Sequence, residues 1–276
     1  MDTLPIAGAQ VKWVNELPAE LPGGTRFGPY LQALPDDALF VVPDVGRFRV
    51  REGRQIEIEV APGCARERAA SFARLAPFGA LIHQRGDVPL HASAVMRPVD
   101  GMVLLIAGAS GAGKSTTAAA LVQRGWQVLN DDVSRLTFED TEGVLVWPGF
   151  QSLKLWDQSC RLLNIDRSQL PATGEIKQKY FWSAAAVRDP QRVSAIVELC
   201  RDGASQDGIQ RMRGATAVQL LGAQTYRPRL VRALGRKAAH FQQLVRVANQ
   251  VLCFRISVGP DTLPAGVAER LDAFFQ

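Results

Sequence analysis

Hydrophobic and polar residues alternate in the first third of the chain. Residues 46–51 and 55–60 carry apolar side chains at every second position, and residues 39–42 form a third short apolar run. A period of two predicts strands that bury one face. Stretches rich in Pro and Gly between these runs, as at residues 21–24 and 28–29, are typical of turns.

An apolar stripe with helical spacing follows at residues 67–84. Its members lie three or four positions apart or side by side, which predicts a helix with one buried face: Phe72, Leu75, Phe78, Leu81 and Ile82. Pro77 removes a backbone donor inside this helix, so we expect a kink or a break there. Short strands followed by a helix predict a small mixed α+β lobe over residues 1–86.

The pattern changes after residue 86. Residues 102–107 form a continuously apolar, buried strand, residues 114–124 a helix closed by Gly125, and residues 126–130 another strand. Strand, loop, helix and strand in this order predict an α/β fold, a sheet with flanking helices, over residues 87–276. Further strands are expected at 91–96, 133–138, 144–147, 194–200 and 251–258, and further helices at 228–250 and 264–275.

The composition is that of a folded globular protein. Of the 276 residues, 47% are hydrophobic, which is ample for a packed core. The formal net charge of +5 comes from single arginines spread along the chain, so we expect a solvated surface and do not favour nucleic acid as a partner. Four cysteines lie far apart in sequence and predict free thiols: Cys64, Cys160, Cys200 and Cys253.

The start of the chain has no basic region that would introduce a signal peptide, and the apolar run at residues 103–107 is too short to cross a bilayer. We therefore expect a cytoplasmic protein that does not engage a membrane.

A glycine-rich motif lies between the apolar strand and the helix, and it satisfies the pattern G-x-x-x-x-G-K-[ST] without a departure. Its residues are Gly108, Ala109, Ser110, Gly111, Ala112, Gly113, Lys114 and Ser115. Glycines let successive backbone N–H groups face a phosphate, Lys114 supplies positive charge, and the Ser115 hydroxyl is an Mg²⁺ ligand. We therefore predict that this loop, with Thr116 after it, binds the phosphates of ATP or GTP.

Two adjacent carboxylates, Asp131 and Asp132, end the strand that follows the helix. Beside a triphosphate, one aspartate could orient and deprotonate an attacking hydroxyl while the other helps to hold Mg²⁺. An Asx-type turn between two strands is the alternative. The nearby phosphate loop favours the catalytic interpretation.

These features together resemble a known family. Residues 90–95 around His91, the phosphate loop, Arg124-Gly125 and Asn130-Asp131-Asp132 are similar to the catalytic domain of HPr kinase/phosphorylase, and above all to its stand-alone, HPr-kinase-like serine kinases. The strong likeness covers about residues 87–133. Some stand-alone relatives occur with lasso-peptide biosynthesis, where they phosphorylate a precursor peptide.

The resemblance implies roles for three residues outside the loop. Asp131 matches the catalytic aspartate that accepts the serine proton, Asp132 its acidic neighbour near the metal, and His91 a histidine close to that aspartate. A core histidine is the alternative for His91. The Glu-Ile-Arg-Gly segment with which the HPr enzymes supply another Mg²⁺ ligand is not found here, which counts against phosphorolysis and against HPr as the substrate.

Residues 151–192 are the expected place for substrate contacts. They contain Lys154, Lys177, Lys179 and Arg188, which could meet a phosphate or a peptide carboxylate. Aromatic residues also cluster here, and for them core packing is favoured over a peptide groove: Trp147, Phe150, Trp156, Phe181 and Trp182.

The sequence thus predicts a P-loop kinase domain of the HPr kinase type behind a small N-terminal lobe. Its expected activity is ATP- and Mg²⁺-dependent transfer of the γ-phosphoryl group to a serine hydroxyl of a peptide or protein, with a lasso-type precursor as one candidate. A kinase for a small-molecule hydroxyl and a nucleotide-dependent binding or regulatory module stay open, as does assembly into a homo-oligomer.

Overall fold

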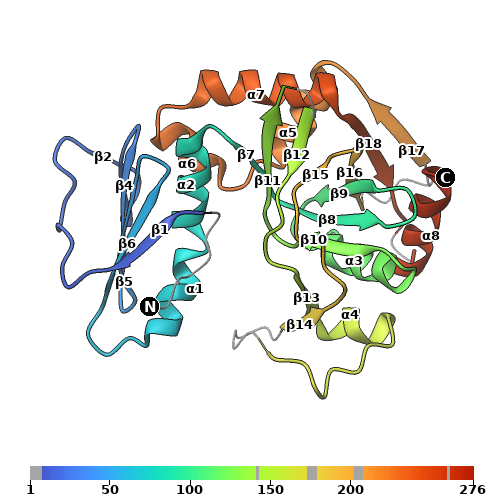
Figure 1. Ribbon diagram of the computed structural model, residues 1–276, viewed down its shortest axis with the longest axis horizontal. Helices are drawn as coiled ribbons and strands as arrows, with labels where there is room; N and C mark the ends of the chain where they lie inside the picture. Colours follow the sequence, from blue (N-terminus) through green and yellow to red (C-terminus); the bar gives the residue numbers. More distant parts are fainter. Residues whose placement is uncertain (1–7, 141–142, 173–178, 202–207, 260–261) are drawn as a thin grey trace. The chain divides into compact units, whose positions relative to one another are not determined.

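The computed structural model describes residues 8–140, 143–172, 179–201, 208–259 and 262–276. The chain divides into two compact units (Figure 1). The first comprises the described residues up to Pro89 together with Tyr226–Gln243, and the second comprises Leu90–Thr225 and Leu244–Gln276. The fold class is mixed α/β, as predicted.

The first unit is built on one sheet of six strands, in the order β1-β6-β5-β4-β3-β2. Its strands are β1 (Gln10–Trp13), β2 (Thr25–Arg26), β3 (Leu31–Leu34), β4 (Asp37–Val42), β5 (Gly46–Arg51) and β6 (Gln55–Val60). The alternation read from the sequence is confirmed in β5 and β6, where Phe48, Val50, Ile56 and Ile58 are fully buried.

Three helices cover one face of this sheet (Figure 1). They are α1 (Arg66–Ala73), α2 (Ala76–Arg85) and α6 (Pro228–Ala233). The predicted break near Pro77 is confirmed, because α2 begins with this proline in its first turn, where no backbone donor is required. The sequence assigned residues 226–243 to the second domain, but Leu230, Ala233 and Leu234 pack in the core of the first unit.

The prediction of one helix over residues 228–250 is wrong. Helix α6 ends at Ala233, and α7 (Lys237–Gln250) begins after Gly235, whose φ is 66°. The N–H of Arg236 bonds to Val231 O at 2.9 Å and that of Gly235 to Arg232 O at 3.1 Å, a glycine-closed helix end.

The second unit contains a six-stranded sheet in the order β10-β8-β9-β16-β18-β17. Its strands are β8 (Ala92–Arg97), β9 (Met102–Gly108), β10 (Gln127–Asn130), β16 (Ala195–Cys200), β17 (Gly208–Met212) and β18 (Leu252–Ser257). Strand β9 is parallel to β16 and antiparallel to β8.

Smaller elements complete this unit. A second sheet has the order β15-β12-β11-β7, and β13 pairs with β14 in a separate antiparallel ribbon. Their bounds are β7 (Val88–Leu90), β11 (Ser134–Glu139), β12 (Gly143–Val146), β13 (Ser152–Trp156), β14 (Lys179–Ser183) and β15 (Gln191–Arg192). The hairpin of β11 and β12 is confirmed, although residues 141–142 of its predicted turn lie outside the described residues.

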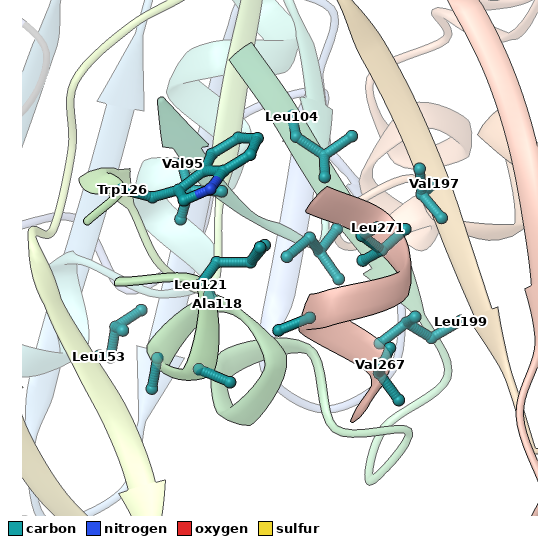
Figure 2. Close-up of a cluster of buried hydrophobic side chains, with 14 of the residues drawn as sticks. Val95, Leu104, Ala118, Leu121, Trp126, Leu153, Val197, Leu199, Val267 and Leu271 are labelled. Atoms are coloured by element: carbon teal, nitrogen blue, oxygen red, sulfur yellow. The ribbon is translucent and has the colours of Figure 1, made fainter. Parts of the chain in front are cut away.

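The helices of the second unit include α3 (Lys114–Gln123), α4 (Asp157–Leu162), α5 (Ala215–Ala223) and α8 (Pro264–Phe274). Helices α3 and α8 pack together over the sheet (Figure 2). Fully buried side chains from α3, α8 and strands β8, β9 and β16 fill this layer: Val95, Leu104, Leu121, Val197 and Leu271. This packing fixes the start of α3 against the end of β9, where the glycine-rich loop lies.

Candidate active site

The loop between β9 and α3 has the strand–loop–helix arrangement that phosphate-binding loops share. Gly108, Gly111 and Gly113 have φ values of 145°, 85° and 100°, a region in which other residues are strained. A Cβ atom on Gly108 would lie 2.7 Å from Leu199 O, so this position also requires glycine for space. Helix α3 begins directly after Gly113, and its free N–H groups face the loop.

Lys114 points back along its own loop. Its Nζ donates to Gly108 O at 2.9 Å and to Ala109 O at 3.2 Å. Burial lowers the pKa of Lys114, and the charges of Asp131 and Asp132 oppose this shift. An ammonium that is largely removed from water and held next to the loop amides is ready to accept phosphate oxygens as partners.

Asp131 is buried and contacts the phosphate loop. Its Oδ1 accepts hydrogen bonds from Ser115 Oγ at 2.9 Å and from Ser93 Oγ at 2.6 Å, and its Oδ2 accepts one from the Lys154 N–H at 2.9 Å. The residue is 3% exposed. The double aspartate therefore does end beside the loop, although β8 lies between β10 and β9 in the sheet.

Asp132 occupies a tight turn and is more open. Its φ is 76°, and the Val133 N–H closes the turn on Asp131 O at 3.0 Å. The side chain is 33% exposed, whereas Asp131 is buried. A non-glycine residue in this backbone region is strained by about 1–3 kcal/mol, and such residues cluster at functional sites.

His91 and Lys154 flank Asp132. His91 Nδ1 lies 2.9 Å from Asp132 O and 3.3 Å from Asp132 Oδ1, while Lys154 Nζ lies 3.2 Å from Asp132 Oδ2. Because a carbonyl oxygen only accepts, Nδ1 is the protonated nitrogen of His91. Burial works to raise the pKa of Asp132, but the charges of Lys154 and His91 outweigh it, so this pKa lies below its usual value.

The β13–β14 ribbon adds a second group of side chains to the site. Lys154 pairs with Phe181, and Trp156 pairs with Lys179, so these four residues share one face of the ribbon. The Lys179 ammonium lies 4.7 Å from the centre of the Trp156 ring, within the range of a cation–π contact.

A cavity of about 530 Å³ joins these parts. The predicted residues that line it are His91, Ser110, Gly111, Gly113, Lys114, Ser115, Thr116, Asp131, Asp132, Lys154 and Lys179. Trp156, Gln158, Ser159 and Leu162 line the side towards the ribbon and α4, and Arg201, Thr262, Leu263 and Pro264 line another. Gly108, Ala109 and Ala112 are not among the lining residues, but their backbone oxygens accept hydrogen bonds from Lys114 and Arg201, which are.

A hydrogen-bond network that no sequence pattern predicts holds the start of the loop. Gln224 Oε1 accepts from the Gly108 N–H at 3.1 Å, and its Nε2 donates to Glu198 Oε1 at 2.9 Å. Its backbone oxygen accepts from the His91 N–H at 2.7 Å. Arg255 Nε completes the chain by donating to Glu198 Oε2 at 2.8 Å. Gln224 therefore fixes the first loop glycine and His91 together.

Other predicted residues lie elsewhere. Arg188 is exposed and does not line the cavity, and Lys177 lies outside the described residues. The preference for core packing of the aromatic cluster is wrong for three members, since Trp147, Phe150 and Trp156 are 36%, 44% and 39% exposed. The five downstream arginines are exposed, as expected of a solvated surface: Arg211, Arg213, Arg227, Arg229 and Arg232.

The donor atoms at the loop fit a magnesium ion. Ser115 Oγ and Asp131 Oδ1 are hard oxygen donors only 2.9 Å apart at the start of α3. Mg²⁺ is usually bound by one or two protein oxygens, phosphate oxygens and water. In the part of the chain that the structure describes, no group of three or more His, Cys, Asp or Glu side chains could hold a metal ion. Two protein oxygens at the loop suit an ion that arrives with a nucleotide.

The class that this geometry defines is a protein with a phosphate-binding loop that faces two carboxylates. No protein-family model matches the chain. Over 105 residues the chain is 36% identical to an HPr kinase/phosphorylase of Geobacillus sp. (strain WCH70). The matched region makes up 38% of this chain and 30% of that protein. This match confirms the resemblance to HPr kinase/phosphorylase.

A comparison with solved structures finds a protein with a related name. The HPr(Ser) kinase/phosphatase of Coxiella burnetii overlaps 68% of this chain and 97% of its own, with 15% sequence identity and a TM-score of 0.36. The sequence match spans less than a third of the Geobacillus protein's length. Among the helices described, none is long and apolar enough to cross a membrane.

Proposed function

We propose that the protein is an ATP- and Mg²⁺-dependent kinase that phosphorylates a serine hydroxyl of a peptide or protein. The observation that carries this proposal is the cavity in which the phosphate loop, Asp131 and Asp132 meet. A nucleotide-binding module needs the loop, but it does not need a second, open carboxylate beside it. The similarity to an HPr kinase/phosphorylase supports the same class of reaction.

The geometry favours a division of labour opposite to the one that the resemblance implies. Asp131 is buried, and its Oδ1 already binds the hydroxyl of Ser115, the predicted Mg²⁺ ligand. Asp132 is open to the cavity, and its carboxylate oxygens face His91 and Lys154. We therefore assign Asp131 to the metal side of the site and Asp132 to the acceptor hydroxyl.

Catalysis in this site depends on position and charge. Bound Mg²⁺ would neutralise phosphate charge next to Ser115 and Asp131. Lys114 would exchange its loop carbonyls for phosphate oxygens, and the N–H groups at the start of α3 would add to the positive field. Asp132, held by Lys154 and His91, would orient the serine hydroxyl and accept its proton.

The test is the intact mass of serine-containing peptides, lasso-type precursors included, after incubation with the protein, ATP and Mg²⁺. We expect a gain of one phosphate. Lys114→Ala should abolish the gain and weaken nucleotide binding. Asp132→Asn should reduce transfer by roughly 10²- to 10⁴-fold, the usual contribution of a positioned acid or base, and leave nucleotide affinity unchanged.

Asp131→Asn is the matched variant. It should weaken binding of Mg²⁺ with ATP, because it removes charge from the oxygen that holds Ser115. An Asp132→Asn protein with normal transfer would contradict the assignment of the two aspartates. Nucleotide binding without transfer to any peptide would contradict the peptide-kinase proposal and direct the search to metabolite hydroxyls or to a binding module.

A further inference from the structure

Lys154 contacts both carboxylates of the candidate active site. Its backbone N–H donates to Asp131 Oδ2 at 2.9 Å, and its Nζ donates to Asp132 Oδ2 at 3.2 Å. The amide and the ammonium group both belong to one residue of strand β13, and pairing with β14 holds this strand in place. Lys154 thus links the two aspartates, and together with His91 it holds the carboxylate of Asp132.

The cations around the cavity are not equivalent. Lys114 donates to the loop carbonyls, Arg201 Nε donates to Ala112 O at 3.2 Å, and Lys179 lies over the Trp156 ring. Lys154 Nζ pairs directly with Asp132 Oδ2 at 3.2 Å, and the charge of Lys179 also lowers the pKa of this carboxyl group. The Lys154 side chain is 27% exposed, which weakens solvent screening of this ion pair.

This contact has a consequence for metal binding. The two oxygens of Asp132 face Lys154 Nζ at 3.2 Å and His91 Nδ1 at 3.3 Å. A divalent ion on Asp132 would lie within a few ångströms of an ammonium group, and like charges at that separation repel strongly. In two-metal phosphoryl sites, acidic side chains normally hold both ions about 4 Å apart. The described residues around this cavity supply two carboxylates, and Lys154 neutralises one of them.

We infer that Lys154 is a positioning residue that restricts the site to one divalent ion, on the side of Ser115 and Asp131, and keeps Asp132 for the acceptor hydroxyl. Its ammonium supplies positive charge where a second ion would otherwise lie. The role in transfer rests on the proposed function, whereas the limit of one ion is a property of binding and can be measured without any transfer.

The test counts metal ions. Free Mn²⁺ is titrated by electron paramagnetic resonance in the presence of the full-length protein and β,γ-imido-ATP, which cannot transfer its phosphate. We expect one Mn²⁺ per chain for the natural protein. Lys154→Glu removes the ammonium and adds a third carboxylate, and it should bind two. Lys237→Glu is the matched control, because it makes the same charge change at an exposed lysine that does not line the cavity, and its count should stay at one.

Two results would overturn the inference. One is a count of two in the natural protein, which needs no variant and is independent of folding defects. The other is a count in Lys154→Glu that equals the count in Lys237→Glu. Failure of the proposed kinase activity leaves these counts interpretable, since they depend on nucleotide and metal binding alone.

Kinetics with an accepted peptide test the positioning role separately. Lys154→Met keeps the side-chain length and the N–H bond to Asp131, so folding and nucleotide binding should persist. We expect kcat to fall at least tenfold while KM for ATP changes less than twofold, and Lys154→Arg to recover most of kcat. An equal loss in Lys237→Met would show a general effect of charge and contradict a specific role for Lys154.

Discussion

At the scale of single residues, the site depends on side chains whose partners are far away in sequence. Gln224 shows this most clearly, because Gly108 lies 116 residues before it. The carboxylate of Glu198 can only accept hydrogen bonds when ionised, so the Gln224 amide must present its NH₂ group there and its oxygen to the loop. The orientation of the amide is therefore determined by chemistry.

Replacing Gln224 with Met should weaken nucleotide binding. The change keeps the volume but leaves the Gly108 N–H without its acceptor, and a buried unsatisfied donor costs about 1–3 kcal/mol. If that cost falls on the loop conformation that binds phosphate, affinity drops by about tenfold or more. Isothermal titration with ATP and Mg²⁺ measures it.

The control for this prediction is Thr225→Val. The Thr225 hydroxyl donates to Leu221 O at 3.1 Å within the same helical segment, so its loss should reduce stability without changing nucleotide affinity. Equal affinities in all three proteins would show that Gln224 does not organise the loop.

The predictable and the unpredictable site residues differ in whether their chemistry is carried by neighbouring residues in the sequence. The phosphate loop and the double aspartate were predictable, because consecutive residues carry their chemistry and the flanking strand and helix are strongly patterned. Lys154 and Gln224 were not assigned these contacts, since a lone lysine or glutamine acquires its role only from the fold. The exposed aromatic side chains of Trp147, Phe150 and Trp156 were misjudged for the same reason.

At the scale of elements, the packing of α2 against residues 226–243 has a measurable dependence on pH. His83 on α2 is 3% exposed, and its Nε2 lies 3.0 Å from Tyr226 O. Burial lowers the pKa of His83 to about 4; the hydrogen bond to Tyr226 O opposes this shift, and the charge of His240 adds to it. The ring of His240 on α7 lies edge-on at 5.5 Å between centroids.

Acidification should therefore destabilise the first unit. The unfolded chain binds a proton on His83 near the ordinary pKa of 6.5, while the folded chain does not until about pH 4. The contribution of His83 is fully present above pH 6.5 and is lost as the pH falls from 6.5 towards 4. At pH 5 the loss is about 2 kcal/mol, from about 1.4 kcal/mol per pH unit.

The measurement is the urea midpoint at pH 7 and at pH 5. His83→Gln keeps a donor for Tyr226 O but does not titrate, so its midpoint should fall less between the two pH values. His240, whose pKa burial also lowers, leaves part of the dependence in the variant. Parallel changes in both proteins would show that His83 is not responsible.

At the scale of the whole molecule, the two units are not successive segments of chain. The sequence places a boundary near residue 87, because the strand pattern and the glycine-rich turns end there. That signal is local, and it carries no information about a later segment that returns to the first sheet. The return is visible in the contacts of α6, whose Leu230 and Leu234 are 3% and 0% exposed within the first core.

A fragment of residues 1–89 should therefore fail to fold alone. Without α6 its core exposes two leucines, and burial of such side chains contributes about 1.5–3 kcal/mol each, comparable to the stability of a small domain. Tyr226 N lies 2.9 Å from Pro89 O, so a short Gly/Ser linker can join residues 1–89 to 226–243. We expect the joined fragment to unfold cooperatively in urea and Leu234→Ala to weaken it by about 2–5 kcal/mol. Circular dichroism of the two fragments decides the question, since a stable fold of residues 1–89 would support the boundary near residue 87 and make α6 dispensable.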